Sequence, residues 1–308
     1  MVTHPLSLGF LAVTGKGGVG KSMVAAAVGG LAARNGRRVL ICDLDASGDV
    51  AAAFGSPAQG YEPVSVAPGV DVMQMNTEAA IRDYLATFTP IPVVSRLGPV
   101  SRGLDLMGRA APGVREVLSV GKLLWFVRQG TYDLVVMDGP ATGHVVGHLA
   151  APVSVGRLAA GGLLATQTSW MTDLLSDPTV AGALVVATPD DGPVDEALAL
   201  VDRIPSATPI GLVGGVVNRM PAVPGLAADL RLLDYVEHAI AQGGSDSASP
   251  GLSAMVGHLV NLRDRGDRAL GCFRRLAERL DPLICWSLPD LGGDPTLEAL
   301  VEILEGEW

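Results

Sequence analysis

The segment from Gly15 to Ser22, Gly-Lys-Gly-Gly-Val-Gly-Lys-Ser, has residue types and spacing that suit the binding of phosphate groups. It fits the pattern G-x-x-x-x-G-K-[ST], which connects a strand to a helix. The backbone N–H groups of such a loop surround phosphate oxygens, and the helix N-terminus adds partial positive charge. Lys21 would neutralise the β- and γ-phosphates, and the Ser22 hydroxyl would bind Mg²⁺. The rest of the expected cradle is Gly15, Gly17, Gly18, Val19 and Gly20.

Lysine is rare in this chain, which makes its use in the loop informative. Three lysines occur against nineteen arginines, and Lys16 and Lys21 are two of the three. A lysine carries a compact ammonium group, whereas the flat guanidinium fork of arginine packs differently, so we expect both positions to need a compact cation. Arginines between residues 263 and 279 alternate with acidic residues, and we interpret that segment as a solvated or salt-bridged helix face.

Three aspartates follow strand-like runs and could serve a metal ion and an attacking water. Asp43 and Asp45 end the run Arg-Val-Leu-Ile-Cys-Asp-Leu-Asp, and Asp138 ends Tyr-Asp-Leu-Val-Val-Met-Asp. Ligands of open α/β sheets bind at the carboxyl ends of the strands, and hydrolysis of a γ-phosphate needs acidic groups there. Solvated or helix-capping aspartates would occupy the same positions, so both interpretations stay open. The loop from Gly139 to His144 is a candidate switch that senses the γ-phosphate.

Apolar runs rich in Val, Ile and Leu alternate with longer helical patterns, as in βαβ units of a parallel sheet buried on both faces. The sequence predicts helices over 21–34, 194–204 and 296–304, and strands near 7–14, 37–43, 70–75, 132–138, 182–188, 210–217 and 283–287. Residues 77–130 and 145–178 interrupt this rhythm with weakly charged, helix-like sequence, and we expect helical insertions on the same sheet. We expect one domain over residues 1–308, with a flexible loop at 242–250.

The composition limits the compartment and the partners. Of the 308 residues 48% are hydrophobic, but the least charged stretch, Leu158 to Thr172, is shorter than the roughly 20 apolar residues of a membrane span. The first residues lack the basic region of a signal peptide, so we expect a cytoplasmic protein without an integral span. A net charge of −10 argues against nucleic acid as a partner. Cys42, Cys272 and Cys285 are too scattered for a disulfide framework or a zinc site, and we interpret them as core residues.

With these residues in view, the chain resembles the ATPases that drive arsenical pumps and guide tail-anchored membrane proteins, the ArsA/GET family with its deviant phosphate loop. The loop and the segment Asp138-Gly-Pro-Ala-Thr-Gly-His144 are the specific matches. Weaker matches are Asp45-Ala-Ser-Gly-Asp-Val-Ala-Ala-Ala-Phe-Gly55, Ala111-Pro-Gly-Val-Arg-Glu116, Val186-Ala-Thr-Pro-Asp190, Val217-Asn-Arg219 and Ser287-Leu-Pro289. The resemblance implies an α/β fold with a doubly wound, mostly parallel sheet and an inserted helical subdomain.

The resemblance also implies roles in Mg²⁺-dependent ATP hydrolysis. Lys16 would be the signature lysine that crosses a face-to-face dimer, formed with a second copy or a paralogue, to touch the phosphates bound by the other subunit. Asp45 would orient the attacking water, and Asp138 would hold Mg²⁺ through a water molecule. Asn218, followed by Arg219, would recognise adenine together with the backbone near Pro289.

Two segments depart from the family pattern. The first switch usually reads Asp-Pro-Ala-His-Asn, and the segment Asp45-Ala46-Ser47-Gly48-Asp49 lacks the Pro and the His, so hydrolysis could be slow. The second switch usually reads Asp-Thr-Ala-Pro-Thr-Gly-His-Thr, and Gly139-Pro140-Ala141 replaces its middle. The paired cysteines that clamp zinc between subunits in some members are missing, so no zinc-bridged dimer is expected.

Three functions remain to be compared. In the first, nucleotide opens and closes a helical groove for an apolar client such as a membrane-protein segment; Trp125, Phe126, Trp170 and Met171 would line that groove or pack inside a closed core. An arsenite-stimulated pump-driving subunit needs three soft ligands, which scattered cysteines do not offer. A positioning or partition ATPase needs a basic surface or a basic amphipathic helix, whereas residues 298–308 are acidic.

Overall fold

The computed structural model describes residues 3–57, 60–88, 113–140, 142–158, 162–221, 238, 250–292 and 296–308. A short 3-10 turn at Pro5–Ser7 precedes the first strand. The strands are β1 (Phe10–Gly15), β2 (Val39–Asp43), β3 (Val64–Ala67), β4 (Val70–Gln74), β5 (Leu134–Asp138), β6 (Ala181–Ala187), β7 (Leu212–Met220) and β8 (Ile284–Pro289). The helices are α1 (Lys21–Arg34), α2 (Asp49–Ala53), α3 (Thr77–Phe88), α5 (Val114–Gln129), α6 (Thr142–Leu158), α7 (Gly162–Ser176), α8 (Asp191–Ala207), α10 (Pro250–Leu280) and α11 (Leu297–Glu307).

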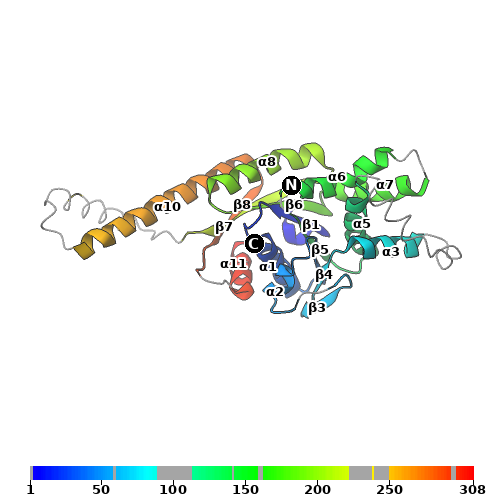
Figure 1. The fold of residues 1–308 in the computed structure, drawn as a ribbon, viewed down its shortest axis with the longest axis horizontal. Coiled ribbons are helices and arrows are strands. Elements are labelled where there is room, and N and C mark those ends of the chain that lie inside the picture. Colours follow the sequence, from blue (N-terminus) through cyan, green and yellow to red (C-terminus); the bar gives the residue numbers. More distant parts are fainter. Residues whose placement is uncertain are drawn as a thin grey trace.

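The strands form one sheet in the order β3-β4-β2-β5-β1-β6-β7-β8. Neighbouring strands are parallel except for β3 with β4 at one edge. Figure 1 shows α8 and α10 along one face of the sheet and α1, α2 and α11 along the other. Because β1 lies between β5 and β6, the loop that leaves β1 meets the carboxyl ends of both neighbours.

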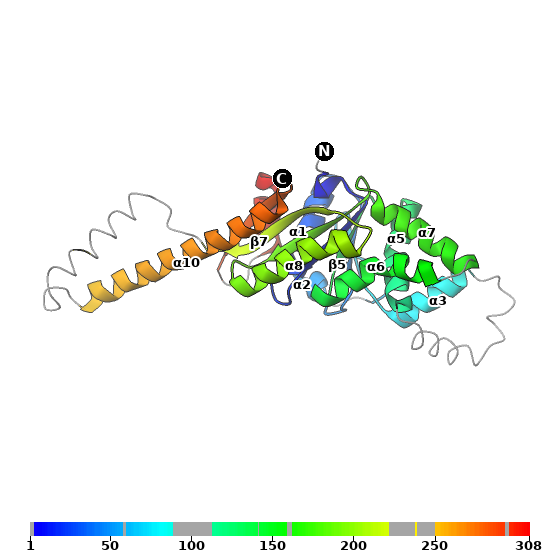
Figure 2. The ribbon, with the colours of Figure 1, turned by 90° about the horizontal axis from the view of Figure 1, so that it is seen from above.

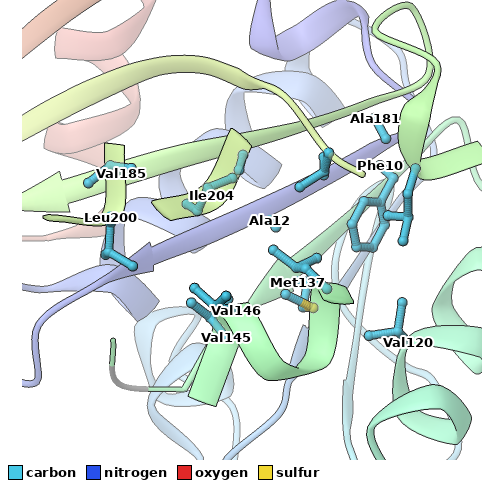
Figure 3. Packing of buried hydrophobic residues seen from close by; sticks show 14 of the residues in the cluster. Phe10, Ala12, Val120, Met137, Val145, Val146, Ala181, Val185, Leu200 and Ile204 are labelled. Carbon is cyan, nitrogen blue, oxygen red and sulfur yellow. The ribbon is translucent and has the colours of Figure 1, made fainter. Parts of the chain in front are cut away.

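Residues along the strands alternate between two hydrophobic cores. Phe10 and Ala12 of β1 belong to the core shared with α3, α5, α6, α7, α8 and α10, whereas Leu11 and Val13 belong to the core shared with α1, α2 and α11. Figure 3 shows Phe10 near Val120 and Met137, so the first core continues from the sheet into the helices at one end of it, α3, α5, α6 and α7, here called the helical end. Burial on both faces accounts for the unbroken apolar run of β1 and fixes the strand that carries the phosphate loop.

The predicted α/β class is confirmed, and each of the predicted strands corresponds to an observed one. β1 begins at Phe10, later than predicted, because Pro5–Ser7 forms a turn whose first N–H is capped by His4. β3 was missing from the prediction: its four residues are exposed or half-buried, and it pairs antiparallel through a bulge. Helix α1 has the predicted bounds, and α8 and α11 extend the predicted helices by a few residues.

The helices of the two predicted insertions gather at one end of the sheet. Figures 1 and 2 show α3, α5, α6 and α7 together at this end, while α10 begins far from the sheet at the opposite end. Residues 242–249 of the predicted loop at 242–250 lie outside the described part of the chain, as do residues 89–112, whereas Pro250 begins α10. Among the described helices, none combines the length and apolar character needed to cross a membrane.

Candidate active site

The phosphate loop joins β1 to α1 and contains two glycines in close contact with neighbouring strands. A Cβ on Gly15, which has φ 155°, would lie 2.1 Å from the carbonyl oxygen of Val186. A Cβ on Gly20, which has φ 90°, would lie 2.4 Å from Nδ2 of Asn218. At Gly17, in contrast, an added Cβ would have no atom within 4 Å. The loop is therefore held against β6 and β7 and is open at its middle.

The two lysines of the loop point to different partners. The Lys21 ammonium donates to the carbonyl oxygen of Lys16 at 3.2 Å, so it folds back over its own loop. The Lys16 ammonium lies 2.9 Å from Oε1 of Glu196 on α8. The N-cap of α1 is Gly20, which supplies no side-chain cap, so the first N–H groups of α1 remain suited to an anion.

Asp138 lies at the carboxyl end of β5, next to the strand that carries the loop. Its Cα pairs in register with Val13 of β1 on one side and with Asp43 of β2 on the other. Oδ1 of Asp138 is buried and has no hydrogen-bond partner among the described residues. Burial raises the pKa of Asp138 to about 7, and the hydrogen bond from Ser22 opposes this rise. A buried carboxylate oxygen without a donor is costly, and a hydrated Mg²⁺ between Ser22 and Asp138 would satisfy it.

Asp43 and Asp45 have different environments although only Leu44 separates them. The buried Asp43 accepts the backbone N–H of Gly48 at 2.8 Å and the hydroxyl of Ser47 at 3.2 Å. It therefore braces the loop between β2 and α2, a role that its position in the sequence did not predict. Asp45 is exposed in this loop, and its charge raises the pKa of Asp138, so it lies within electrostatic reach of that carboxyl. Ala46, directly after Asp45, has a left-handed φ of 52°.

The candidate second switch begins with a close contact to β1. The backbone N–H of Gly139 donates to the carbonyl oxygen of Val13 at 2.9 Å. His144 is exposed, and its carbonyl oxygen lies 2.9 Å from Nδ1 of His148 one turn further along α6. Ala141 lies outside the described residues.

Asn218 and Arg219 of β7 contact the phosphate loop, and Pro289 lies on the neighbouring strand β8. Nδ2 of Asn218 donates to the carbonyl oxygen of Val19 at 2.9 Å, and Nη1 of Arg219 donates to that of Gly18 at 3.4 Å. Arg219 has a left-handed φ of 61°, an uncommon conformation for a residue with a side chain. Pro289 pairs in register with Met220 at the end of β7. Asn218 thus supports the loop directly, in addition to the predicted contact with adenine.

Comparison with known proteins agrees with this geometry. The model of the anion-transporting ATPase family, ArsA_ATPase, matches residues 8–163, about half of the chain and all of the region from β1 to α6. The chain belongs to this family. It is an ATP-hydrolysing enzyme, and the resemblance to the ArsA/GET ATPases is confirmed.

Relatives from three organisms share this similarity. ATPase BagA of Mycobacterium tuberculosis is 31% identical over 252 residues, which cover 78% of this chain and 72% of the relative. The ATPase ASNA1 homolog of Entamoeba dispar is 30% identical over 153 residues, covering 47% of this chain and 46% of the relative. ATPase GET3B of Arabidopsis thaliana is 25% identical over 169 residues, covering 47% and 41%.

A groove of about 900 Å³ opens beside the phosphate loop of this ATPase. Lys16, Arg219 and three arginines of α10 contribute to its walls: Arg265, Arg268 and Arg275. Arg275 pairs with Asp191 at 3.1 Å and Asp195 at 2.5 Å, as expected of a salt-bridged helix face. No local signal in the sequence predicted that α10 would face the loop, because the contact joins segments more than 200 residues apart.

The aromatic residues of the helical end are packed in this conformation. Met171 is buried, and Trp125 and Trp170 are half-buried with their rings 6.3 Å apart. The guanidinium carbon of Arg128 lies 4.9 Å from the Trp170 ring centre, a cation–π contact. These helices enclose a pocket of only about 80 Å³. Lys122, the third lysine, pairs with Asp83 beside this pocket.

Proposed function

We propose that this ATPase hydrolyses Mg²⁺-bound ATP between two subunits and couples the cycle to an apolar client. The catalytic part rests on Oδ1 of Asp138, which has no hydrogen-bond partner in the part of the chain that the structure describes and lies beside Ser22 and the glycine cradle. Bound Mg²⁺ would offset charge on the β- and γ-phosphates. The Ser22 hydroxyl would bind the ion directly, and Asp138 would hold it through a water molecule.

The remaining residues then act on the nucleotide and on water. Lys21 would bind the phosphates within its own chain. Asp45 is exposed on a loop braced by Asp43, which suits a group that moves to orient the attacking water. Lys16 would reach the phosphates of the partner subunit, and Asn218 would link the adenine site to the loop through Val19.

The client part of the proposal concerns the end formed by α3, α5, α6 and α7. Its core residues, among them Val120 and Leu149, continue into the core under β1 and β5, so movement near the phosphates can reach these helices through packed side chains. The small pocket beside Trp125 and Trp170 would then widen in one nucleotide state and expose apolar surface. A cytoplasmic location, where ATP and Mg²⁺ are available, is part of the same proposal.

An arsenite-stimulated activity has less support from the cysteines. Cys42 is fully buried on β2, and burial raises its pKa well above the usual range. Burial also raises the pKa of Cys285 to about 12. Thiols of this kind are poor metalloid ligands because the thiolate is the ligating form.

The catalytic proposal predicts different effects for three substitutions. Lys21→Ala removes charge-assisted hydrogen bonds to phosphate and should weaken ATP binding by about 10- to 100-fold. Asp45→Asn should keep binding and lower turnover by about 100-fold or more, because it removes the group that orients water. Lys16→Ala should keep binding by the single chain and lose the rise in turnover with protein concentration.

These effects can be measured by equilibrium dialysis with Mg²⁺ and ATP, by phosphate release and by sedimentation. Arg34→Ala, at the other end of α1, is the matched control because it also removes one exposed cation, which pairs with Glu298. Failure of the parent chain to retain ATP with Mg²⁺ at millimolar concentration would contradict the catalytic proposal. Unchanged, concentration-dependent turnover in Lys16→Ala would contradict the role of the dimer.

A further inference from the structure

The contact between Lys16 and Glu196 joins the phosphate loop to the first turns of α8. Nζ of Lys16 lies 2.9 Å from Oε1 of Glu196, and the two side chains are 40% and 38% exposed. A Cβ on Gly192 would lie 3.5 Å from the same Nζ, so the lysine rests on the start of α8. The Lys16 ammonium is therefore held by its own chain.

Both ends of this contact are attached to well-packed parts of the molecule. Glu196 lies on α8 between Val194 and Ala197, and the side chains of these two residues are fully buried. On the other side, the carbonyl oxygen of Lys16 accepts the ammonium of Lys21. The position of Glu196 relative to the loop is thus determined by the packing of α8 against the sheet.

The neighbouring acids of α8 have a different cation. Asp191 and Asp195 pair with Arg275 of α10, which ties α8 to α10. Glu196 is the acid of this helix that lies within ion-pair distance of the phosphate loop. The acids of α8 therefore have separate roles. Asp191 and Asp195 join α8 to α10, whereas Glu196 orients the side chain of Lys16.

We propose that Glu196 is a positioning residue that holds Lys16 against α8 within its own chain and releases it when the ATP-bound dimer forms. The inference rests on the proposed function, in which Lys16 reaches the phosphates of the partner subunit. To reach those phosphates across the dimer, the Lys16 ammonium would leave Glu196 of its own chain. The ion pair therefore competes with these phosphates for Lys16 and weakens the ATP-bound dimer.

The size of the effect follows from the exposure of the pair. An exposed ion pair changes an equilibrium by about 1.4- to fivefold. A symmetric dimer would break two such pairs, so the factors multiply. Removing the carboxylate with Glu196→Gln should therefore tighten the dimer by about two- to 25-fold.

The test is the dimer dissociation constant measured by sedimentation with Mg²⁺ and a non-hydrolysable ATP analogue. The variants are Glu196→Gln, Lys16→Ala and the double variant, each with its thermal midpoint as a check on folding. Asp202→Asn is the matched control, because it removes one charge from the same helix and breaks an exposed pair with Arg279 away from the loop. Glu196→Gln and Asp202→Asn each remove one negative charge, which by itself reduces the repulsion between two acidic chains. The control therefore corrects the dimer dissociation constant for this change in charge.

Each outcome decides the matter. Tightening by Glu196→Gln beyond that of Asp202→Asn, with no such effect when Lys16 is already Ala, supports the proposal. An unchanged or weaker dimer in Glu196→Gln overturns it, and so does an equal effect in the Lys16→Ala background. In those cases the parent still binds the analogue and forms dimers, so the proposed function stands. A parent that binds the analogue without forming dimers overturns both this inference and the role of the dimer.

Discussion

At the scale of single residues, Gly20 shows how strongly the loop depends on the absence of a side chain. Its φ of 90° disfavours any residue but glycine, and an added Cβ would lie 2.4 Å from Nδ2 of Asn218. We predict that Gly20→Ala lowers the free energy of unfolding by about 1–3 kcal/mol and weakens ATP binding at least tenfold. Urea unfolding and equilibrium dialysis would measure the two effects. Gly17→Ala is the control for stability, since its Cβ would meet no atom within 4 Å.

Asp133, at the opposite end of β5 from Asp138, gives a prediction about pH. Hydrogen bonds from the side chain and the backbone N–H of Arg38 lower the pKa of Asp133 to about 2, against 3.8 without them. A group whose pKa is lower in the folded state stabilises fully above 3.8 and loses this contribution as pH falls through 2. Because the pair is exposed, we expect Asp133→Asn to cost only about 1 kcal/mol at pH 7.

The cost of Asp133→Asn should shrink at pH 3 and disappear below pH 2. Urea midpoints of the parent and the variant at pH 7 and pH 3 would measure it. An equal difference between the midpoints of parent and variant at pH 7 and at pH 3 would show that the carboxylate charge of Asp133 contributes nothing to stability.

At the scale of elements, substitution of two glycines of α6 by alanine should have opposite effects on stability. A Cβ on Gly156 would lie 2.8 Å from Oγ1 and 3.4 Å from Cβ of Thr168 on α7, and threonine has little freedom at χ1. Gly156→Ala should therefore push α6 from α7 and destabilise the chain by about 1–3 kcal/mol. Gly147 lies on the same helix with nothing within 4 Å, so Gly147→Ala should stabilise by about 0.5–1 kcal/mol. Thermal unfolding would measure both changes in stability. Changes of the same sign would contradict close packing of α6 against α7 at Gly156.

The comparison of these elements with the sequence shows which physical signals are local. The run of apolar residues in β1 and the motif that opens α1 act over a few residues, so both elements were predicted within a few positions. β3 was missed because four partly exposed residues at a sheet edge carry almost no hydrophobic pattern. The bonds from Asn218 to Val19 and from Lys16 to Glu196 join residues about 180 to 200 apart. Such pairs depend on how the sheet and α8 pack, which no short segment encodes.

At the scale of the whole molecule, the core under β1 and the helical end is continuous. Leu149 of α6 is fully buried in the same core as Phe10 of β1 and Val120 of α5. Continuous packing of this kind favours unfolding in one step, in which the helical end and the sheet are lost together. We therefore expect Leu149→Ala to lower the free energy of unfolding by about 2–5 kcal/mol. Leu158→Ala, on the same helix but 81% exposed, should have little effect.

Tryptophans at two places in the molecule can report whether the helical end and the sheet lose stability together. Trp125 and Trp170 lie at the helical end, whereas Trp286 and Trp308 lie together beyond β7 with ring centres 4.8 Å apart. Replacing either pair by phenylalanine leaves fluorescence from one region only. In the Leu149→Ala background both probes should shift to the same lower urea midpoint, because the core that contains Leu149 and the core that contains Trp286 lie on the two faces of one sheet. An early transition at Trp125 and Trp170 with an unchanged midpoint at Trp286 would instead show that the helical end unfolds separately, and a separately unfolding end could open for a client without moving the sheet.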